Sequence, residues 1–146
     1  MRAHIWCLGL LVMAGCGEVS ISNQPLSGKI GGNPWTFGTG ETDSFLSTTD
    51  SLFVNLYSGS FATCASAAPT GADSVIMQMP TKPGSYDLSL QMNATLYVAS
   101  TTQNFVATSG RLQIDSATAT TISGGLNASY NGSNAVNGQF QAAICP

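Results

Sequence analysis

Apolar and polar residues alternate along most of the chain from residue 25 onward, which is the period of a β-strand with one buried face. In the run 51–57, for example, Leu52, Val54 and Leu56 all fall on one face. No stretch of useful length has a helical period. The pattern therefore predicts an all-β domain over residues 25–146.

Turn signals divide this domain into short strands. Gly31-Gly32-Asn33-Pro34 and Asn131-Gly132-Ser133-Asn134 predict two hairpin turns. Roughly eight or nine strands with turns between them are typical of an antiparallel β-sandwich, with a small β-barrel as the alternative. The expected strands are 26–30, 35–37, 51–57, 75–79, 84–90, 95–98, 110–115, 118–130 and 136–144.

Two stretches are expected to interrupt this regularity. Residues 39–50 are polar and turn-prone, and they predict a loop or a frayed edge. Gly124-Gly125 falls inside the strand 118–130 and predicts a bulge or a sharp bend. In the run 84–90, alternation predicts that Tyr86, Leu88 and Leu90 point inward.

The opening residues 1–15 have a different pattern. Arg2 provides a positive head, residues 5–13 are apolar, and the small pair Ala14-Gly15 precedes Cys16. This order is typical of a secretory signal peptide. The apolar run is too short for a spanning helix, which needs about 20 residues.

The small residues before Cys16 resemble the lipobox of bacterial lipoproteins. The resemblance implies cleavage between Gly15 and Cys16 and attachment of lipid to Cys16. An ordinary secretory signal cut elsewhere is the alternative. The stretch 26–37, with its G-x-I-G-G-x-P-W pattern, looks like the opening of small exported bacterial lipoproteins of uncharacterised families, and it adds no function.

The same resemblance implies a location. Residues 16–24 are polar and lack periodicity, so they predict a lipidated N-terminus followed by a flexible tether. Gly17 stands after the cysteine where an Asp retains similar lipoproteins at the inner membrane, which favours the outer membrane. The expected partner is a membrane, held through the N-terminal lipid in the bacterial cell envelope.

Cysteine usage agrees with export. The sequence has four cysteines. Cys7 leaves with the signal and Cys16 takes the lipid, so Cys64 and Cys145 remain as a pair. An oxidising compartment would join them in a disulfide.

Composition excludes several functions. Only 8% of the residues are charged while 43% are hydrophobic, which indicates a folded domain without a basic patch, so nucleic acid is a poor partner. The single histidine, His4, lies in the signal. Its removal argues against histidine-dependent hydrolysis and against imidazole metal sites, so we expect no catalytic residue, no metal and no cofactor.

Two weaker candidate sites remain. Glu41, Asp43 and Asp50 are close in sequence, and carboxylates can bind calcium or, when suitably paired, hydrolyse glycosidic bonds. The aromatic residues Trp35, Phe37 and Tyr57 are candidates for a weak binding surface, with sheet packing as the ordinary alternative.

The sequence thus predicts a lipid-anchored envelope protein with a structural or binding role that is not an enzyme. The envelope partner is a protein or a glycan that the sequence does not identify. The alternatives are a carboxylate-based envelope enzyme acting on glycan and a secreted binding domain without lipid.

Overall fold

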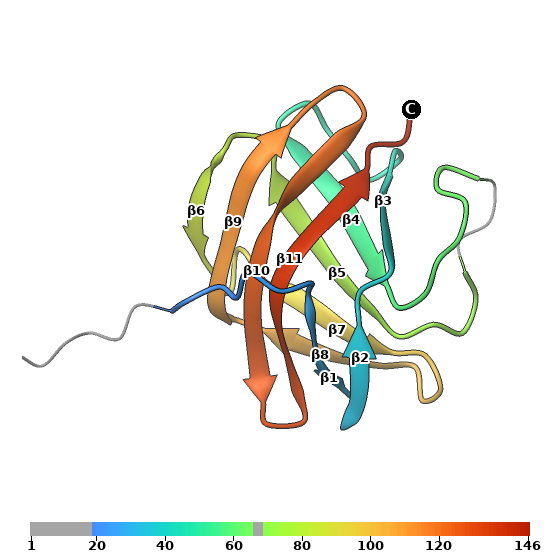
Figure 1. Ribbon diagram of the computed structural model, residues 1–146, viewed down its shortest axis with the longest axis vertical. Coiled ribbons are helices and arrows are strands. Elements are labelled where there is room, and N and C mark those ends of the chain that lie inside the picture. Colours follow the sequence, from blue (N-terminus) through green and yellow to red (C-terminus); the bar gives the residue numbers. More distant parts are fainter. Residues whose placement is uncertain (1–18, 66–68) are drawn as a thin grey trace, which may run out of the picture.

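The computed structural model describes residues 19–65 and 69–146, and the regular secondary structure of this part consists of β-strands (Figure 1). The all-β prediction is confirmed. Eleven strands occur in the described residues: β1 (Ser27–Ile30), β2 (Asn33–Thr36), β3 (Thr39–Asp43), β4 (Ser51–Tyr57), β5 (Ser74–Pro80), β6 (Gly84–Asp87), β7 (Ala94–Val98), β8 (Gln103–Ala107), β9 (Ser109–Ala117), β10 (Thr121–Asn131) and β11 (Asn134–Ala143).

The strands form one continuous sheet. Its order is β6-β9-β10-β11-β3-β4-β5-β7-β8, with the β1–β2 hairpin attached to β11. Neighbouring strands run antiparallel except β11 and β3, which meet in parallel where Ala143 faces Glu41. The sheet curls into an open half-barrel, with β6 and β8 as its ends (Figure 1). Division into the two packed layers of a sandwich stays a prediction.

Alternating side chains from the concave face of the sheet form the core. Leu52, Val54 and Leu56 of β4 are buried as their spacing predicted. Leu112 of β9 and Leu126 of β10 are also fully buried in the same cluster. Each fully buried side chain of this size stabilises the fold by about 1.5–3 kcal/mol. The curl of the sheet is therefore maintained by a continuous apolar interior.

Both predicted hairpin turns are present and they contact each other. Gly31 and Gly32 adopt φ values of 60° and 81°, which glycine tolerates without strain. The Gly31 N–H donates to the side chain of Asn134 (2.7 Å), and the Gly32 N–H donates to the Ser133 carbonyl (2.9 Å). The β1–β2 turn is thus fastened to the β10–β11 turn, although the two are distant in sequence.

The predicted irregularity in β10 is also confirmed. The register between β10 and β9 shifts between Ser123 and Gly124. A Cβ at Gly124 would lie 1.9 Å from the carbonyl oxygen of Gln113, so a larger residue does not fit there without displacement of β9.

Three expectations about strands and burial are wrong. Residues 39–43 form β3 instead of a loop, because β4 supplies an antiparallel partner along their whole length. Strand β8 was not expected at all. Leu90 is 81% exposed instead of inward, because β6 ends at Asp87 and the chain turns away from the sheet before Leu90.

The expected flexible tether is wrong for its described part. Residues Ser20–Gln24, which we call the strap, lie across the outer face of β10 and β11 (Figure 1). The Ser22 N–H donates to Asn137 (2.8 Å), and the Gln24 carbonyl accepts from the Gln139 N–H (2.8 Å). Polar residues without periodicity are therefore fixed here by hydrogen bonds to the sheet.

Candidate functional site

A groove of about 550 Å³ opens where β3, β4 and the C-terminus meet, and we call it the disulfide groove. It lies on the side of the sheet away from β6 and β9. The residues that line it are Glu41, Thr42, Asp43, Ser44, Phe45, Phe53, Asn55, Tyr57, Cys64, Ala65, Cys145 and Pro146.

The groove takes its name from the Cys64–Cys145 disulfide, which confirms the predicted pairing. The sulfur atoms are 2.11 Å apart and the Cα atoms are 5.2 Å apart. Cys64 has a φ of 57°, so the loop turns sharply at this residue. The Cys145 N–H donates to the Thr42 hydroxyl (2.8 Å), which fixes the C-terminus to β3. The disulfide therefore joins the loop after β4 to the end of the last strand.

Glu41 supports this junction from β3. Its side chain is only 8% exposed, and its Oε2 accepts the Cys64 N–H at 2.7 Å. The same oxygen lies 4.0 Å from Cys145 Sγ. Glu41, Cys64 and Cys145 thus lie close together, but the two sulfur atoms are bonded to each other and are not thiolate ligands. The carboxylate holds the loop in place.

Only two of the three predicted acids share the groove. Asp43 is two residues after Glu41 on β3, so both side chains are on the same face. Asp43 Oδ1 accepts the Phe45 N–H (2.9 Å) and the Leu46 N–H (3.3 Å). Asp50 is exposed and lies outside the groove. The carboxylate-enzyme alternative requires Glu41, Asp43 and Asp50 to converge in one cleft, and the groove holds only the first two.

Tyr57 forms one wall of the disulfide groove. Burial raises the pKa of its phenol above the usual 10.0, and the carboxylates of Glu41 and Asp43 raise that pKa further because they repel the phenolate. The ring of Phe61 packs edge-on against Tyr57, with 5.4 Å between the ring centroids. The wall is thus a neutral, hydrogen-bond-capable aromatic surface beside two acids.

The aromatic residues expected to form a binding surface do not share one. Trp35 is only 4% exposed, and its Nε1 donates to the Asp73 carbonyl (3.0 Å). Phe37 packs against the core, and Tyr57 alone of the three lines the groove. The prediction of a joint surface formed by Trp35, Phe37 and Tyr57 is wrong.

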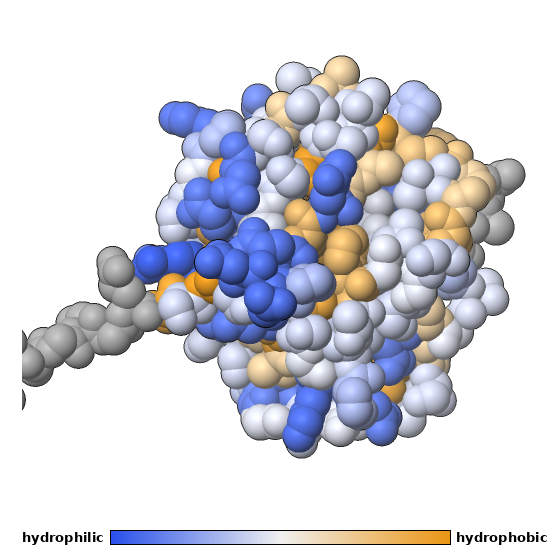
Figure 2. Space-filling model, viewed as in Figure 1, coloured by the Kyte–Doolittle hydropathy of each residue, from blue (hydrophilic) through white to orange (hydrophobic). Residues whose placement is uncertain are grey.

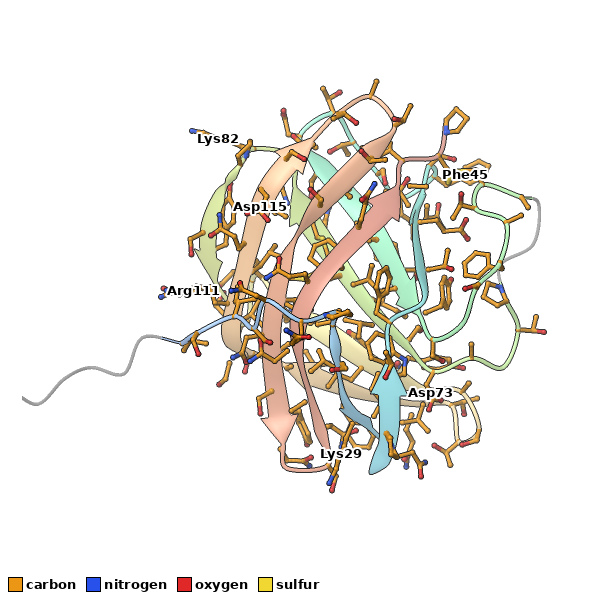
Figure 3. The ribbon with its side chains drawn as sticks, in the orientation of Figure 1. Lys29, Phe45, Asp73, Lys82, Arg111 and Asp115 are labelled. Carbon is orange, nitrogen blue, oxygen red and sulfur yellow. A yellow bond between two sulfur atoms is a disulfide. The ribbon has the colours of Figure 1, made fainter. Side chains whose placement is uncertain are left out.

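Sequence reasoning missed the most exposed aromatic residue, Phe45. It is 98% exposed at the turn after β3, and its neighbour Leu46 is 53% exposed. Figure 3 shows Phe45 near the C-terminus, on the side away from Arg111. An adjacent Phe-Leu pair inside an otherwise polar run was the signal that could have revealed it.

A second hollow, of about 380 Å³, lies beside the strap. Its walls are largely polar, and Figure 2 shows hydrophilic residues gathered over this face next to the start of the described chain. The residues that line it are Val19, Ile21, Asn23, Ser85, Arg111, Gln113, Asp115 and Gln139.

The predicted cleavage and lipidation residues, Gly15 and Cys16, lie outside the described residues. Within the described residues, the structure has no helix with the length and apolar character needed to cross a membrane. Comparison with protein-family models, with curated proteins and with solved structures finds no match for this chain.

Proposed function

We propose that this chain is a lipid-anchored protein of the bacterial cell envelope that binds an envelope partner through the disulfide groove. The lipid on Cys16 would attach the domain, and Gly17 favours the outer membrane. For the fold, we propose a sandwich in which β9, β10 and β11 form one layer over a second layer of β4, β5 and β7, an arrangement consistent with Figure 1.

The observation that carries this proposal is the exposed Phe45 at the rim of an acidic, aromatic groove. An isolated, almost completely exposed Phe contributes nothing to the core, whereas aromatic side chains in a partner's pocket contribute strongly to binding. The neighbouring carboxylates of Glu41 and Asp43 favour a partner with cationic groups.

The hydrogen bonds of the two acids favour binding over catalysis. Glu41 accepts the Cys64 N–H, and Asp43 accepts two N–H groups of the turn that carries Phe45. Both carboxylates therefore shape the rim of the groove. We infer a polypeptide partner that presents apolar and cationic side chains together.

Site-specific photo-crosslinking in the native host tests the binding proposal. A photoreactive phenylalanine analogue replaces Phe45 in one variant and Leu90 in a control, since Leu90 is also exposed and apolar but lies outside the groove. We expect a discrete cross-linked product from position 45 alone. The product should weaken with Asp43→Asn, which keeps the amide oxygen as an acceptor but removes the charge. Equal products from both positions would overturn the proposed groove.

Intact mass of the protein from the membrane fraction tests the anchor. We expect a chain that begins at Cys16 and carries acyl chains, and we expect Cys16→Ser to abolish both features. An unmodified chain in the soluble fraction would instead support a secreted binding domain without lipid.

A further inference from the structure

The strap fits a trough that two glycines leave open on the outer face of β10 and β11. A Cβ at Gly125 would lie 2.5 Å from Ile21 Cγ2, and a Cβ at Gly138 would lie 2.6 Å from the Gln24 carbonyl oxygen. Neither strand accommodates a side chain at these positions without displacing the strap.

Side-chain amides fix the strap along this trough. The Ser20 carbonyl accepts from Asn127 Nδ2 (2.8 Å) and Asn137 Nδ2 (3.3 Å). The Ser22 carbonyl accepts from Gln139 Nε2 (2.9 Å). With the backbone bonds already described, every second residue of the strap is held to the sheet. The strap is therefore part of the folded domain.

From this geometry we infer that the strap is a rigid mount that holds one side of the domain against the lipid headgroups. This inference rests on the proposed lipid at Cys16. Only three Cα steps separate Cys16 from Val19, so the chain can extend about 11 Å at most before the fixed part of the molecule begins. If the whole strap were released, the nine steps to Pro25 would reach about 32 Å, more than twice the radius of gyration of about 14 Å expected for such a domain.

The short reach determines which side of the domain faces the membrane. This is the side formed by β6 and β9, which we call the exit side. Val19 lines the same hollow as Ser85 of β6 and Arg111 of β9. Figure 3 shows Lys82, Asp115 and Arg111 on this side, with Phe45 across the molecule. A membrane within about 11 Å of Val19 would thus contact the exit side and leave the disulfide groove facing outward.

The exit side and the disulfide groove differ in charge. On the exit side, Arg111 Nε pairs with Asp87 at 3.1 Å, and the exposed Lys82 is offset by the exposed Asp115, which lines the same hollow as Arg111. The disulfide groove instead carries Glu41 and Asp43. The orientation therefore brings a side with balanced charges to the anionic headgroups and keeps the groove acids away from them.

Chemical labelling of the two lysines tests the orientation. The full lipidated chain, taken from membranes, is reconstituted into vesicles of phosphatidylethanolamine and phosphatidylglycerol and treated with a water-soluble acetylating reagent. Lys82 and Lys29 are both exposed, but Lys29 lies at the far end of the β1–β2 hairpin (Figure 3). We expect acetylation of Lys82 to be several-fold slower on vesicles than in detergent, and the rate for Lys29 to stay the same.

Variants separate the mount from the anchor. Asn137→Ala removes two hydrogen bonds to the strap, and Gly125→Val fills the place of Ile21; both should restore rapid acetylation of Lys82 while the lipid remains attached. Gln141→Ala, an exposed change on the same strand outside the strap, should retain the protection. If Gly125→Val fails to fold, Asn137→Ala and a Gly/Ser insertion after Gly17 give the same test.

The outcomes are distinguishable. A chain without lipid overturns both this inference and the proposed anchor. A lipidated chain whose Lys82 is acetylated equally fast on vesicles and in detergent overturns the rigid mount alone. Protection of Lys82 that survives in Asn137→Ala and in the Gly/Ser insertion also overturns it, because the contact would then not depend on the strap.

Discussion

Loss of the Cys64–Cys145 disulfide should be the most damaging change on the surface of this domain. The double variant Cys64→Ala/Cys145→Ala removes the covalent link and leaves the apolar core unchanged, since neither cysteine belongs to the core cluster. Its effect therefore falls mainly on the unfolded chain, which becomes free to open a long loop.

The magnitude follows from the length of that loop. The two cysteines are 81 residues apart, and chain entropy assigns about 4.5 kcal/mol to a cross-link of that span. The hydrogen bond from the Cys64 N–H to Glu41 is not counted in this loss, because alanine at position 64 keeps the backbone N–H. Since loss of a native disulfide typically costs a small disulfide-bonded domain about 2–5 kcal/mol, we expect a loss of about 2–4.5 kcal/mol in the free energy of unfolding.

Urea unfolding followed by Trp35 fluorescence measures this loss. The double variant should unfold at lower urea, with a steeper dependence on urea because its unfolded chain is more open. Wild-type protein kept in reductant should match it, and Thr63→Ala, an exposed change in the same loop, should stay within about 0.5 kcal/mol of wild type. A loss below about 1 kcal/mol in the double variant would refute the entropic argument.

Three further outcomes follow from the structure. Gly110 has a φ of +132°, and the Cβ of Gly110→Ala would lie 1.9 Å from a carbonyl oxygen of β10. Urea unfolding of this variant should show a loss of roughly 1–3 kcal/mol or more in the free energy of unfolding. Gly132→Ala is the control, because its Cβ would have no atom within 4 Å and the free energy of unfolding should change little. Leu126→Ala should lower the free energy of unfolding by about 2–5 kcal/mol, because Leu126 is completely buried. Phe45→Ser should leave the free energy of unfolding unchanged, because Phe45 is almost completely exposed. Equal losses for the two variants in thermal unfolding would contradict the assignment of the core. The phenol of Tyr57 should titrate above pH 10.0 in the folded state, as followed by tyrosinate absorbance. Because its folded pKa is raised, the stability it contributes is complete below pH 10.0 and is lost as the pH rises through the folded value. Tyr57→Phe should remove that component of the alkaline loss, and an unchanged profile would contradict it.

The sequence predicted elements wherever local chemistry alone determines the structure. Alternation identified β4, paired glycines identified the β1–β2 turn, and Asn131-Gly132 identified the β10–β11 turn. These features depend on neighbouring residues, so no knowledge of the rest of the fold was needed.

The sequence failed where a distant partner determines the structure. Strand β3 contains no residue that is large and apolar, and it is a strand because β4 pairs with it and because Leu56 and Ala142 fill the space beside Gly40. The strap was missed for the same reason, since its partners lie more than a hundred residues away.

The candidate site was predictable only in part. Cysteine counting identified the disulfide, and the acidic residues of the 39–50 run drew attention to Glu41 and Asp43. The groove itself was not predictable, because it exists only where the loop after β4 meets the C-terminus. Phe45 became a candidate only when its side chain proved to be exposed next to that junction.

The position of β11 in the sheet also determines when the chain can fold. This last strand pairs with β10, β1 and β3, and Cys145 follows it directly. A chain that is still being synthesised or threaded through a narrow channel lacks the surface on which β1, the strap and Cys64 assemble. The fold is therefore completed only after the final residues of the chain emerge.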